Sequence, residues 1–147
     1  MGGSDDKKQF REKVRILERA LGILSDSEMS CCGVTLAQCH AIVEIGRAKV
    51  ISLHALAELL NLDNSTMSRT VNNLVIRCMA KRELDSEDRR YVTIALTENG
   101  MKVFEGIENG MELYFSSLFE GIPENKRSQV LESLDIIIHA MDTVKCC

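Results

Sequence analysis

The stretch from Leu62 to Gly100 constrains the fold more than any other part of the chain. Its first half, LDNSTMSRTVNNLV, places apolar residues at helical spacing on one side and small polar groups on the other. Its second half contains two short strand-like runs, residues 81–84 and 91–96, joined by the charged turn DSEDRR. The stretch therefore predicts a polar helix followed by a β-hairpin with a basic tip.

The outward face of this helix carries candidate binding residues, because its hydroxyl, amide and guanidinium groups suit phosphates and base edges. They are Ser65, Thr66, Ser68, Arg69, Asn72 and Asn73. Arg89 and Arg90 add two cations at the hairpin tip, where a basic side chain suits the DNA backbone or minor groove. A simpler role remains open for Ser65 and Thr66, which lie where hydroxyls commonly cap a helix.

Two shorter helices are expected before the polar one. Thr35 and Gln38 form a capping-box pattern, which predicts a helix over 36–45 that Gly46 ends. A third helix is expected over 53–60, followed by a tight turn. A short helix, a tight turn and a polar helix together form the helix-turn-helix pattern.

Amphipathic helices are predicted on both sides of this unit. Residues 6–24 carry an N-terminal apolar stripe, and 25–33 read as a linker closed by Gly33. Thr97 is expected to cap a long helix, and Pro123 fits the first turn of a last one. The apolar stripe of the N-terminal helix must be covered, either by the chain's own last helix or by a partner subunit.

Composition limits the class of protein. The 147 residues, 45% of them hydrophobic, suit one compact unit. The net charge of -4 argues against a nucleic-acid partner, but residues 47–91 contain eight Lys/Arg and six Asp/Glu. DNA binding is therefore expected to be site-dependent and salt-sensitive. Neither a signal peptide nor a membrane span is apparent in the sequence, so we expect a soluble, cytoplasmic protein with no membrane partner.

The run SLHALAELLNLDNSTMSRTVNNLV, followed by DSEDRRYVTIALTENG, resembles the MarR family of bacterial winged-helix regulators. The resemblance covers nearly the whole chain, and the DRR wing followed by LT-x-x-G is its most specific part. It implies a mainly α fold with a small β-hairpin wing, in which residues 33–96 form the winged helix-turn-helix DNA-binding domain. Residues 5–30 and 97–147 would form a helical dimerisation domain.

The same resemblance implies a homodimer, expected to be a repressor, on a pseudopalindromic double-stranded operator. It places the polar face of the fourth helix in the major groove and Arg90 in the minor groove, with Asp88 bracing a wing arginine by an ion pair. Cys78 departs from the family, which usually has a glycine there. A cysteine must either adopt a left-handed conformation at some cost or end the helix differently.

Six cysteines raise the question of an effector, because a cytosolic setting keeps thiols reduced. The candidate metal, metalloid or redox residues are Cys31, Cys32, Cys39, His40, Cys146 and Cys147. Thiolates with one imidazole suit trivalent arsenic, cadmium, zinc or copper(I). Thiol oxidation, a small organic ligand and purely structural cysteines remain open.

Other classes of function fit the sequence less well. A Gly-rich phosphate loop, a nucleophile elbow and an HExxH motif are all missing from the sequence, so we do not expect an enzyme. A protein-binding winged helix is the remaining alternative, and it predicts that Arg69 and Arg90 are dispensable.

Overall fold

The computed structural model describes the backbone of residues 3–144 and the side chains of residues 3–22 and 33–144. The chain divides into two compact units, Met1–Glu108 and Asn109–Cys147. The first holds the elements in the order α1 (Gly3–Cys32), α2 (Leu36–Ala48), β1 (Val50–Ser52), α3 (Leu53–Leu59), α4 (Asn64–Ile76), β2 (Ala80–Leu84), β3 (Val92–Leu96) and the first part of α5 (Glu98–Glu120). The structure confirms the expected fold class, a mainly helical protein with a small β-hairpin wing.

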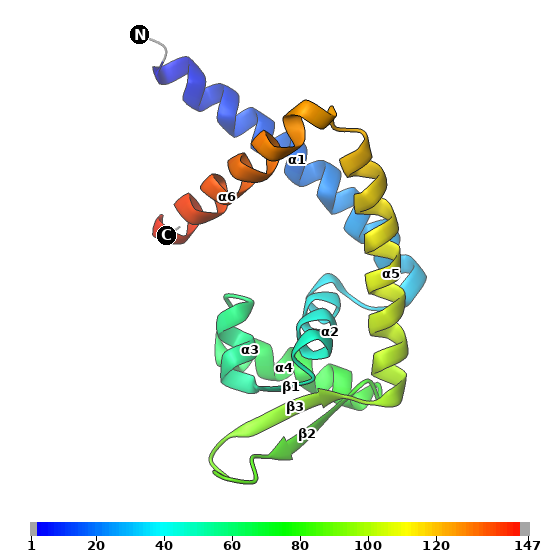
Figure 1. The fold of residues 1–147 in the computed structure, drawn as a ribbon. Coiled ribbons are helices and arrows are strands. Elements are labelled where there is room, and N and C mark those ends of the chain that lie inside the picture. Colours follow the sequence, from blue (N-terminus) through cyan, green and yellow to red (C-terminus); the bar gives the residue numbers. More distant parts are fainter. Residues whose placement is uncertain (1–2, 145–147) are drawn as a thin grey trace. The chain divides into compact units, whose positions relative to one another are not determined.

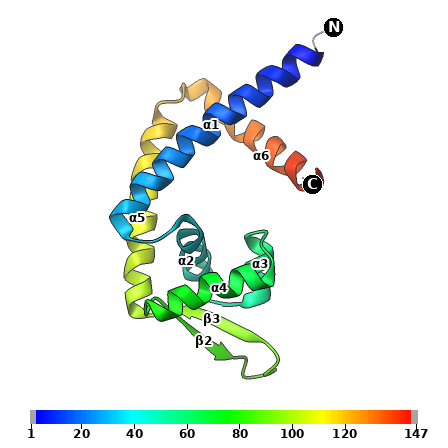
Figure 2. The same cartoon turned by 180° about the vertical axis from the view of Figure 1, so that it is seen from behind.

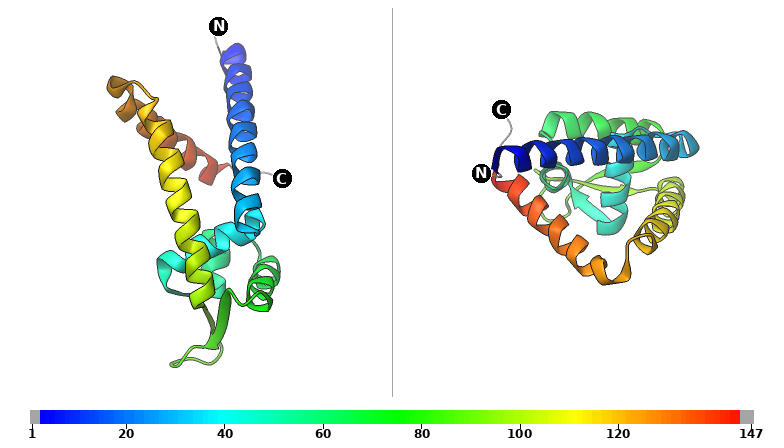
Figure 3. Two further views of the ribbon diagram at one scale, coloured as in Figure 1. Left: turned by 90° about the vertical axis from the view of Figure 1, so that its right-hand side faces the viewer. Right: turned by 90° about the horizontal axis from the view of Figure 1, so that it is seen from above.

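The sheet of the first unit is antiparallel, with strand order β1-β3-β2. Helices α2, α3 and α4 gather beside it, and the turn between β2 and β3 projects away from them (Figures 1 and 3). The small core lies between these elements, and its largest fully buried side chains come from α2, α3, α4 and β3. They are Ile42, Ile45, Leu56, Met67, Val71, Leu74 and Ile94. Burying this side of α4 leaves Arg69, Asn72 and Asn73 on its other side exposed. Figure 2 shows the course of α4 beside α2 and α3.

The first helix is longer than the sequence pattern predicts. α1 continues through Cys32, so the expected linker over 25–33 is wrong for all but its last residue. Between Leu24 and Gly33 the chain has neither proline nor glycine to interrupt the helix. Gly33 follows the last helical residue with φ 69°, a left-handed conformation that glycine adopts without strain.

The second helix begins as predicted but ends later. Thr35 Oγ1 accepts the Gln38 N–H at 3.2 Å, and Gln38 Oε1 accepts the Thr35 N–H at 3.1 Å, so the capping box is confirmed. Gly46 does not end the helix, which runs to Ala48. The Phe104 ring of α5 instead occupies the space that a Cβ at position 46 would need. The role of this glycine is therefore close packing between α2 and α5.

Strand β1 has no counterpart among the sequence predictions. It pairs with β3 in the register Val50↔Ala95, Ile51↔Ile94 and Ser52↔Thr93. Three residues are too few to show a period-two pattern, which is why the sequence indicated only a two-stranded hairpin. Ser52 also caps α3, since its Oγ accepts the Ala55 N–H at 3.1 Å.

The second unit contains the end of α5, the 3₁₀ turn η1 (Glu124–Lys126) and α6 (Arg127–Thr143). Pro123 is the N-cap residue of η1, and α6 begins at Arg127, so the prediction that Pro123 lies in the first turn of the last helix is wrong. No residue of α6 is buried, although the helix carries a predicted apolar stripe. Within the described residues, no helix combines the length and apolar character needed to cross a membrane.

Candidate nucleic-acid interface

The N-terminus of α4 is organised by Asp63, the N-cap residue. Its Oδ1 accepts the Thr66 N–H at 2.8 Å and the Ser65 hydroxyl at 2.6 Å, and its Oδ2 accepts the Thr66 hydroxyl at 2.6 Å. The hydroxyl hydrogen bonds from Ser65 and then Thr66, followed by the Thr66 N–H, hold the pKa of the Asp63 carboxyl far below its usual range. Asp63 is therefore a carboxylate at neutral pH, and both candidate hydroxyls are bound to it.

Ser68 lies one turn further along α4 and contacts the wing. Arg82 of β2 donates from Nη2 to the Ser68 carbonyl at 2.9 Å and to the Ser68 hydroxyl at 3.1 Å. Arg82 pairs with Ile94 in the hairpin, and Ile94 is fully buried. Arg82 therefore stands on the helix-facing side of β2 and joins the base of the wing to the middle of α4.

The remaining candidates on α4 are free to meet a ligand. Arg69, Asn72 and Asn73 are all exposed. Within the described part of the chain, the side chains of these three residues form no hydrogen bond or ion pair. Met67, Val71 and Leu74 on the opposite side are fully buried, so the orientation of α4 is fixed by its apolar stripe.

The C-terminus of α4 resolves the question raised by Cys78. Cys78 adopts φ 60°, and its N–H donates to the Val75 carbonyl at 3.0 Å while the Met79 N–H donates to the Leu74 carbonyl at 2.8 Å. These two bonds form a Schellman motif with a cysteine where glycine is usual. The helix ends in the glycine-like way, so the chain enters β2 directly despite the substitution.

The wing turn carries both predicted arginines. Arg90 forms an ion pair with Asp88, with Nη2 2.8 Å from Oδ2 and Nε 3.0 Å from Oδ1. The side-chain bond from Arg90 holds the pKa of Asp88 below its usual value. Arg89 is exposed beside it. The pairing fixes the direction of one wing cation before any ligand binds.

A further contact, absent from the sequence predictions, joins the end of α4 to the start of α2. Arg77, the C-cap residue of α4, donates from Nη1 to Gln38 Oε1 at 3.0 Å. The same oxygen caps the start of α2, and the Gln38 side chain is largely buried. The junction between α1 and α2 is thus hydrogen-bonded to the end of α4.

The candidate thiol set is only partly described. Cys31 and Cys32 are the last two residues of α1, with side chains outside the described set, and Cys146 and Cys147 lie outside the described residues. Cys39 is buried while His40 is exposed, so these neighbours face different surroundings. Among the described residues, no group of three or more potential metal ligands is present.

Sequence reasoning missed Asp63 and Arg82, which bind three of the predicted hydroxyl residues. The signal for Asp63 was available, because aspartate followed by Ser and Thr two and three residues later is a cap pattern. Arg82 had no such signal, since its partner lies fourteen positions away and the contact depends on where β2 starts.

Comparison with known proteins identifies a family model that matches part of this chain. Residues 33–90 match the MarR family model. A curated relative from Bacillus subtilis (strain 168), the uncharacterized HTH-type transcriptional regulator YfiV, is 23% identical over 142 residues, covering 97% of this chain and 88% of the relative.

Solved structures share the fold at low identity. FabT from Streptococcus pneumoniae in complex with DNA matches with a TM-score of 0.82 and 18% identity, covering 93% of this chain and 99% of that one. The S. aureus MepR–DNA complex matches with a TM-score of 0.79 and 19% identity over 90% of this chain and 97% of that one. A MarR transcriptional regulator from Methanosarcina mazei Go1 has a TM-score of 0.78 and 22% identity, covering 94% and 99%.

Proposed function

We propose that this chain is a member of the MarR family and a homodimeric DNA-binding transcriptional regulator that acts as a repressor in the cytoplasm. MarR family members are transcription regulators rather than enzymes. The observation that carries the proposal is the outward face of α4, where Arg69, Asn72 and Asn73 are exposed beside a wing that presents Arg89 and Arg90. Such a helix suits the major groove, and such a wing suits the adjacent backbone or minor groove.

The comparisons support the DNA partner, because FabT and MepR have been solved with DNA and share the fold. The charge distribution supports it as well. Despite a net charge of -4 for the whole chain, Lys and Arg outnumber Asp and Glu over 47–91, the part that holds α4 and the wing. The protein would bind an operator with a pseudopalindromic sequence, one half-site for each subunit.

DNA binding is tested with the full chain and the duplex upstream of its own coding region. Arg69→Ala should weaken binding at least tenfold, because Arg69 has no competing partner in the described structure and lies on the reading face. Arg11→Ala, an exposed arginine of α1, is the matched control and should leave affinity within about twofold. Equal DNA affinity of both variants would remove Arg69 from the interface, and a wild type that does not bind DNA would favour a protein-binding winged helix instead.

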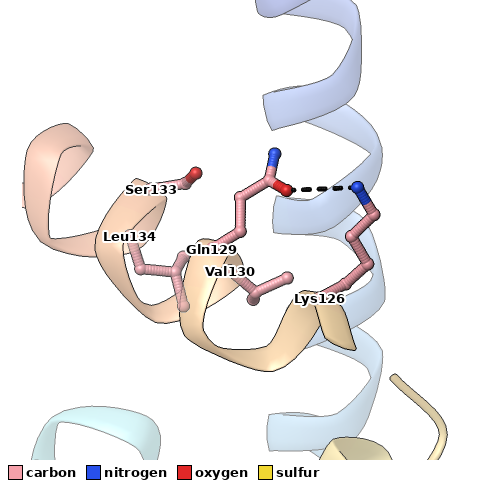
Figure 4. A pocket seen from close by; sticks show the side chains of 5 residues that line it. All are labelled: Lys126, Gln129, Val130, Ser133 and Leu134. Carbon is pink, nitrogen blue, oxygen red and sulfur yellow. Dashed lines mark hydrogen bonds between the residues drawn. The ribbon is translucent and has the colours of Figure 1, made fainter. Parts of the chain in front are cut away.

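The homodimer is inferred from large apolar side chains that are exposed in the described part of the chain. Ile136, Ile138 and Met141 of α6 are 62%, 58% and 69% exposed, and Leu113 of α5 is 74% exposed. Large apolar side chains gathered in this number on exposed helices are unusual for a monomer. Figure 4 shows an open pocket along η1 and the first turns of α6, lined by Lys126, Gln129, Val130, Ser133 and Leu134. A second copy of the chain is the occupant that we propose.

Light scattering on the purified protein tests the assembly. The wild type should have twice the mass of the 16.4 kDa chain. Ile138→Glu places a charge on the apolar face of α6 and should shift the population to monomer, whereas Glu132→Gln on the same helix should not. A wild-type monomer at micromolar concentration would remove the dimer from the proposal.

Control by a thiophilic ion is the finer part of the proposal. A soft metal or metalloid bound at the thiolates of Cys31, Cys32, Cys146 and Cys147 would set the affinity for DNA. The hydrogen bond between Arg77 and Gln38 supports a route for such control, since it connects the residues just after Cys32 with the end of α4. Cys39 is buried while His40 is exposed, so we leave that pair out of the proposed ligand set.

Thiol control is tested by titrating reduced protein with arsenite, cadmium and zinc while DNA affinity is followed. A shift that disappears when all four cysteines are replaced by Ser supports ion sensing. A shift with peroxide instead, accompanied by a disulfide on non-reducing gels, supports thiol oxidation. If neither treatment changes affinity, small organic ligands become the remaining class of effector.

A further inference from the structure

The hydroxyl groups at the start of α4 have a fixed hydrogen-bonding direction. Ser65 Oγ and Thr66 Oγ1 each lie 2.6 Å from a carboxylate oxygen of Asp63. An ionised carboxylate has no hydrogen to give, so the hydrogen of each bond belongs to the hydroxyl. Both hydroxyls therefore donate their one hydrogen to Asp63, and toward any other partner they can act only as hydrogen-bond acceptors.

This direction decides which groups of a duplex these two residues can meet. Phosphate oxygens are acceptors, and a hydroxyl whose hydrogen is already used has nothing to donate to them. The negative charge of Asp63 beside the hydroxyls repels phosphate as well. The hydrogen-bond donors in the major groove are the N6 amino group of adenine and the N4 amino group of cytosine.

One turn further along α4, the Ser68 hydroxyl has the opposite hydrogen-bonding role. Its hydroxyl oxygen accepts a hydrogen bond from Arg82 at 3.1 Å, so its own hydrogen remains available. The Arg82 guanidinium bonds through Nη2 alone, which leaves further N–H groups for an anion. Ser68 and Arg82 thus present hydrogen-bond donors and a positive charge, which suit phosphate. Ser65 and Thr66, beside Asp63, present hydrogen-bond acceptors and a negative charge.

We infer that Asp63 is a specificity-determining residue of the DNA interface, because it makes Ser65 and Thr66 hydrogen-bond acceptors that select adenine or cytosine amino groups. The inference rests on the proposed function and adds to it the class of base that the first turn of α4 reads. Asp63 acts through its two neighbours and need not touch DNA itself.

The test is selection of bound sequences from a random duplex library with the full wild-type chain and the Asp63→Asn variant. The wild type should enrich adenine or cytosine at fixed positions of each half-site. Replacing that base by its analogue without the amino group, purine for adenine or 2-pyrimidinone for cytosine, should weaken wild-type binding about threefold to tenfold. Asparagine has one acceptor oxygen where aspartate has two, so at least one hydroxyl hydrogen is released. The variant should lose the preference at those positions and tolerate the analogue.

Two controls separate this effect from loss of charge or of folding. Glu58→Gln removes one negative charge from α3 without touching Ser65 or Thr66, and it should keep the wild-type base preference. The double change Ser65→Ala and Thr66→Val leaves the Asp63 cap on the Thr66 N–H in place and should also lose the preference. If Asp63→Asn does not fold, the double variant and the loss of wild-type affinity for the analogue without the amino group together still test whether the hydroxyls accept hydrogen bonds from the base.

The outcomes are distinct. Retention of the wild-type preference by Asp63→Asn overturns the role of Asp63, and its retention by the double variant overturns base reading by the two hydroxyls. Either result leaves the proposed function intact. A wild type that enriches no sequence overturns the proposed function and this inference with it.

Discussion

The carbonyl oxygen of Met79 lies directly against the Cα of Gly100, in the space that a Cβ would occupy. The Thr97 N–H donates to the same carbonyl at 3.0 Å, and the Thr97 hydroxyl donates to the Cys78 carbonyl at 2.6 Å. The start of α5 is thus packed against the link between α4 and β2. This contact gives a physical reason for glycine in the sequence LTENG, because only glycine allows the two backbones to approach so closely.

Gly100→Ala should therefore be strongly destabilising. The new methyl group would collide with a backbone carbonyl, which cannot move aside as a flexible side chain can, so we expect a loss of at least about 2 kcal/mol in the free energy of unfolding. Denaturant unfolding followed by circular dichroism measures it. Gly106→Ala is the matched control on the same helix, where a Cβ would meet nothing within 4 Å. It should leave stability unchanged or raise it by up to about 1 kcal/mol, and equal losses for both variants would contradict the assignment.

Cys78→Gly should stabilise the chain. A side chain at φ 60° costs about 1–2 kcal/mol, and glycine removes this cost while adding some entropy to the unfolded state. We expect a net gain of about 0.5–1 kcal/mol, measured by reversible unfolding under reducing conditions. Cys78→Ala removes the thiol but keeps the left-handed strain, so it should show no such gain. If Cys78→Ala stabilises the chain as much as Cys78→Gly does, the destabilisation comes from the thiol rather than from the left-handed backbone.

Asp88→Asn should weaken specific DNA binding through the wing. Without the carboxylate, Arg90 loses the ion pair that holds it at 2.8 Å, and its side chain must be ordered at the moment of binding. We expect a loss of about threefold to tenfold for a specific site, although one negative charge has been removed from the interface. Arg90→Ala should lose more and also reduce the slope of log affinity against log salt by about one. An unchanged specific affinity for both variants would show that the wing does not contact DNA.

Asp63 should contribute to stability in a pH-dependent way. Its folded pKa lies below its ordinary value because Ser65 and Thr66 donate to the carboxylate, so the ionised form is favoured by folding. This contribution is fully present above the unfolded pKa of about 3.9 and is lost as pH falls through the folded pKa. The unfolding free energies of wild type and Asp63→Asn should differ by a constant amount between pH 5 and 7, and the difference should shrink below about pH 4. A difference independent of pH down to pH 2 would contradict the proposed bonding.

Much of the helix-turn-helix and wing can be predicted from sequence alone, because the sequence patterns that indicate its helices are local. The Thr35 and Gln38 box and the buried stripe of Met67, Val71 and Leu74 depend on residues within one or two turns. The family resemblance, carried by the residues from Ser52 to Gly100, agrees with the family match over 33–90.

The features that sequence reasoning missed depend on contacts between distant residues. Gly46 looked like a helix end, but the Phe104 ring from α5 decides its role. The sequence gives Arg82 and Arg77 no partner within a few positions, and their contacts with Ser68 and Gln38 arise only in the fold. The hydroxyls of Ser65 and Thr66 were correctly placed on the outward face, yet their partner Asp63 was not considered.

Competition binding tests the central claim, sequence-specific DNA recognition by α4 and the wing, most directly. The full chain is bound to a selected duplex at physiological salt and displaced either by the same duplex or by one of scrambled sequence. The account predicts that the specific duplex binds at least about a thousandfold more tightly than the scrambled one, and that the double change Arg69→Ala and Arg90→Ala removes most of this ratio. A ratio near one for the wild type, or an undiminished ratio for the double variant, would contradict it.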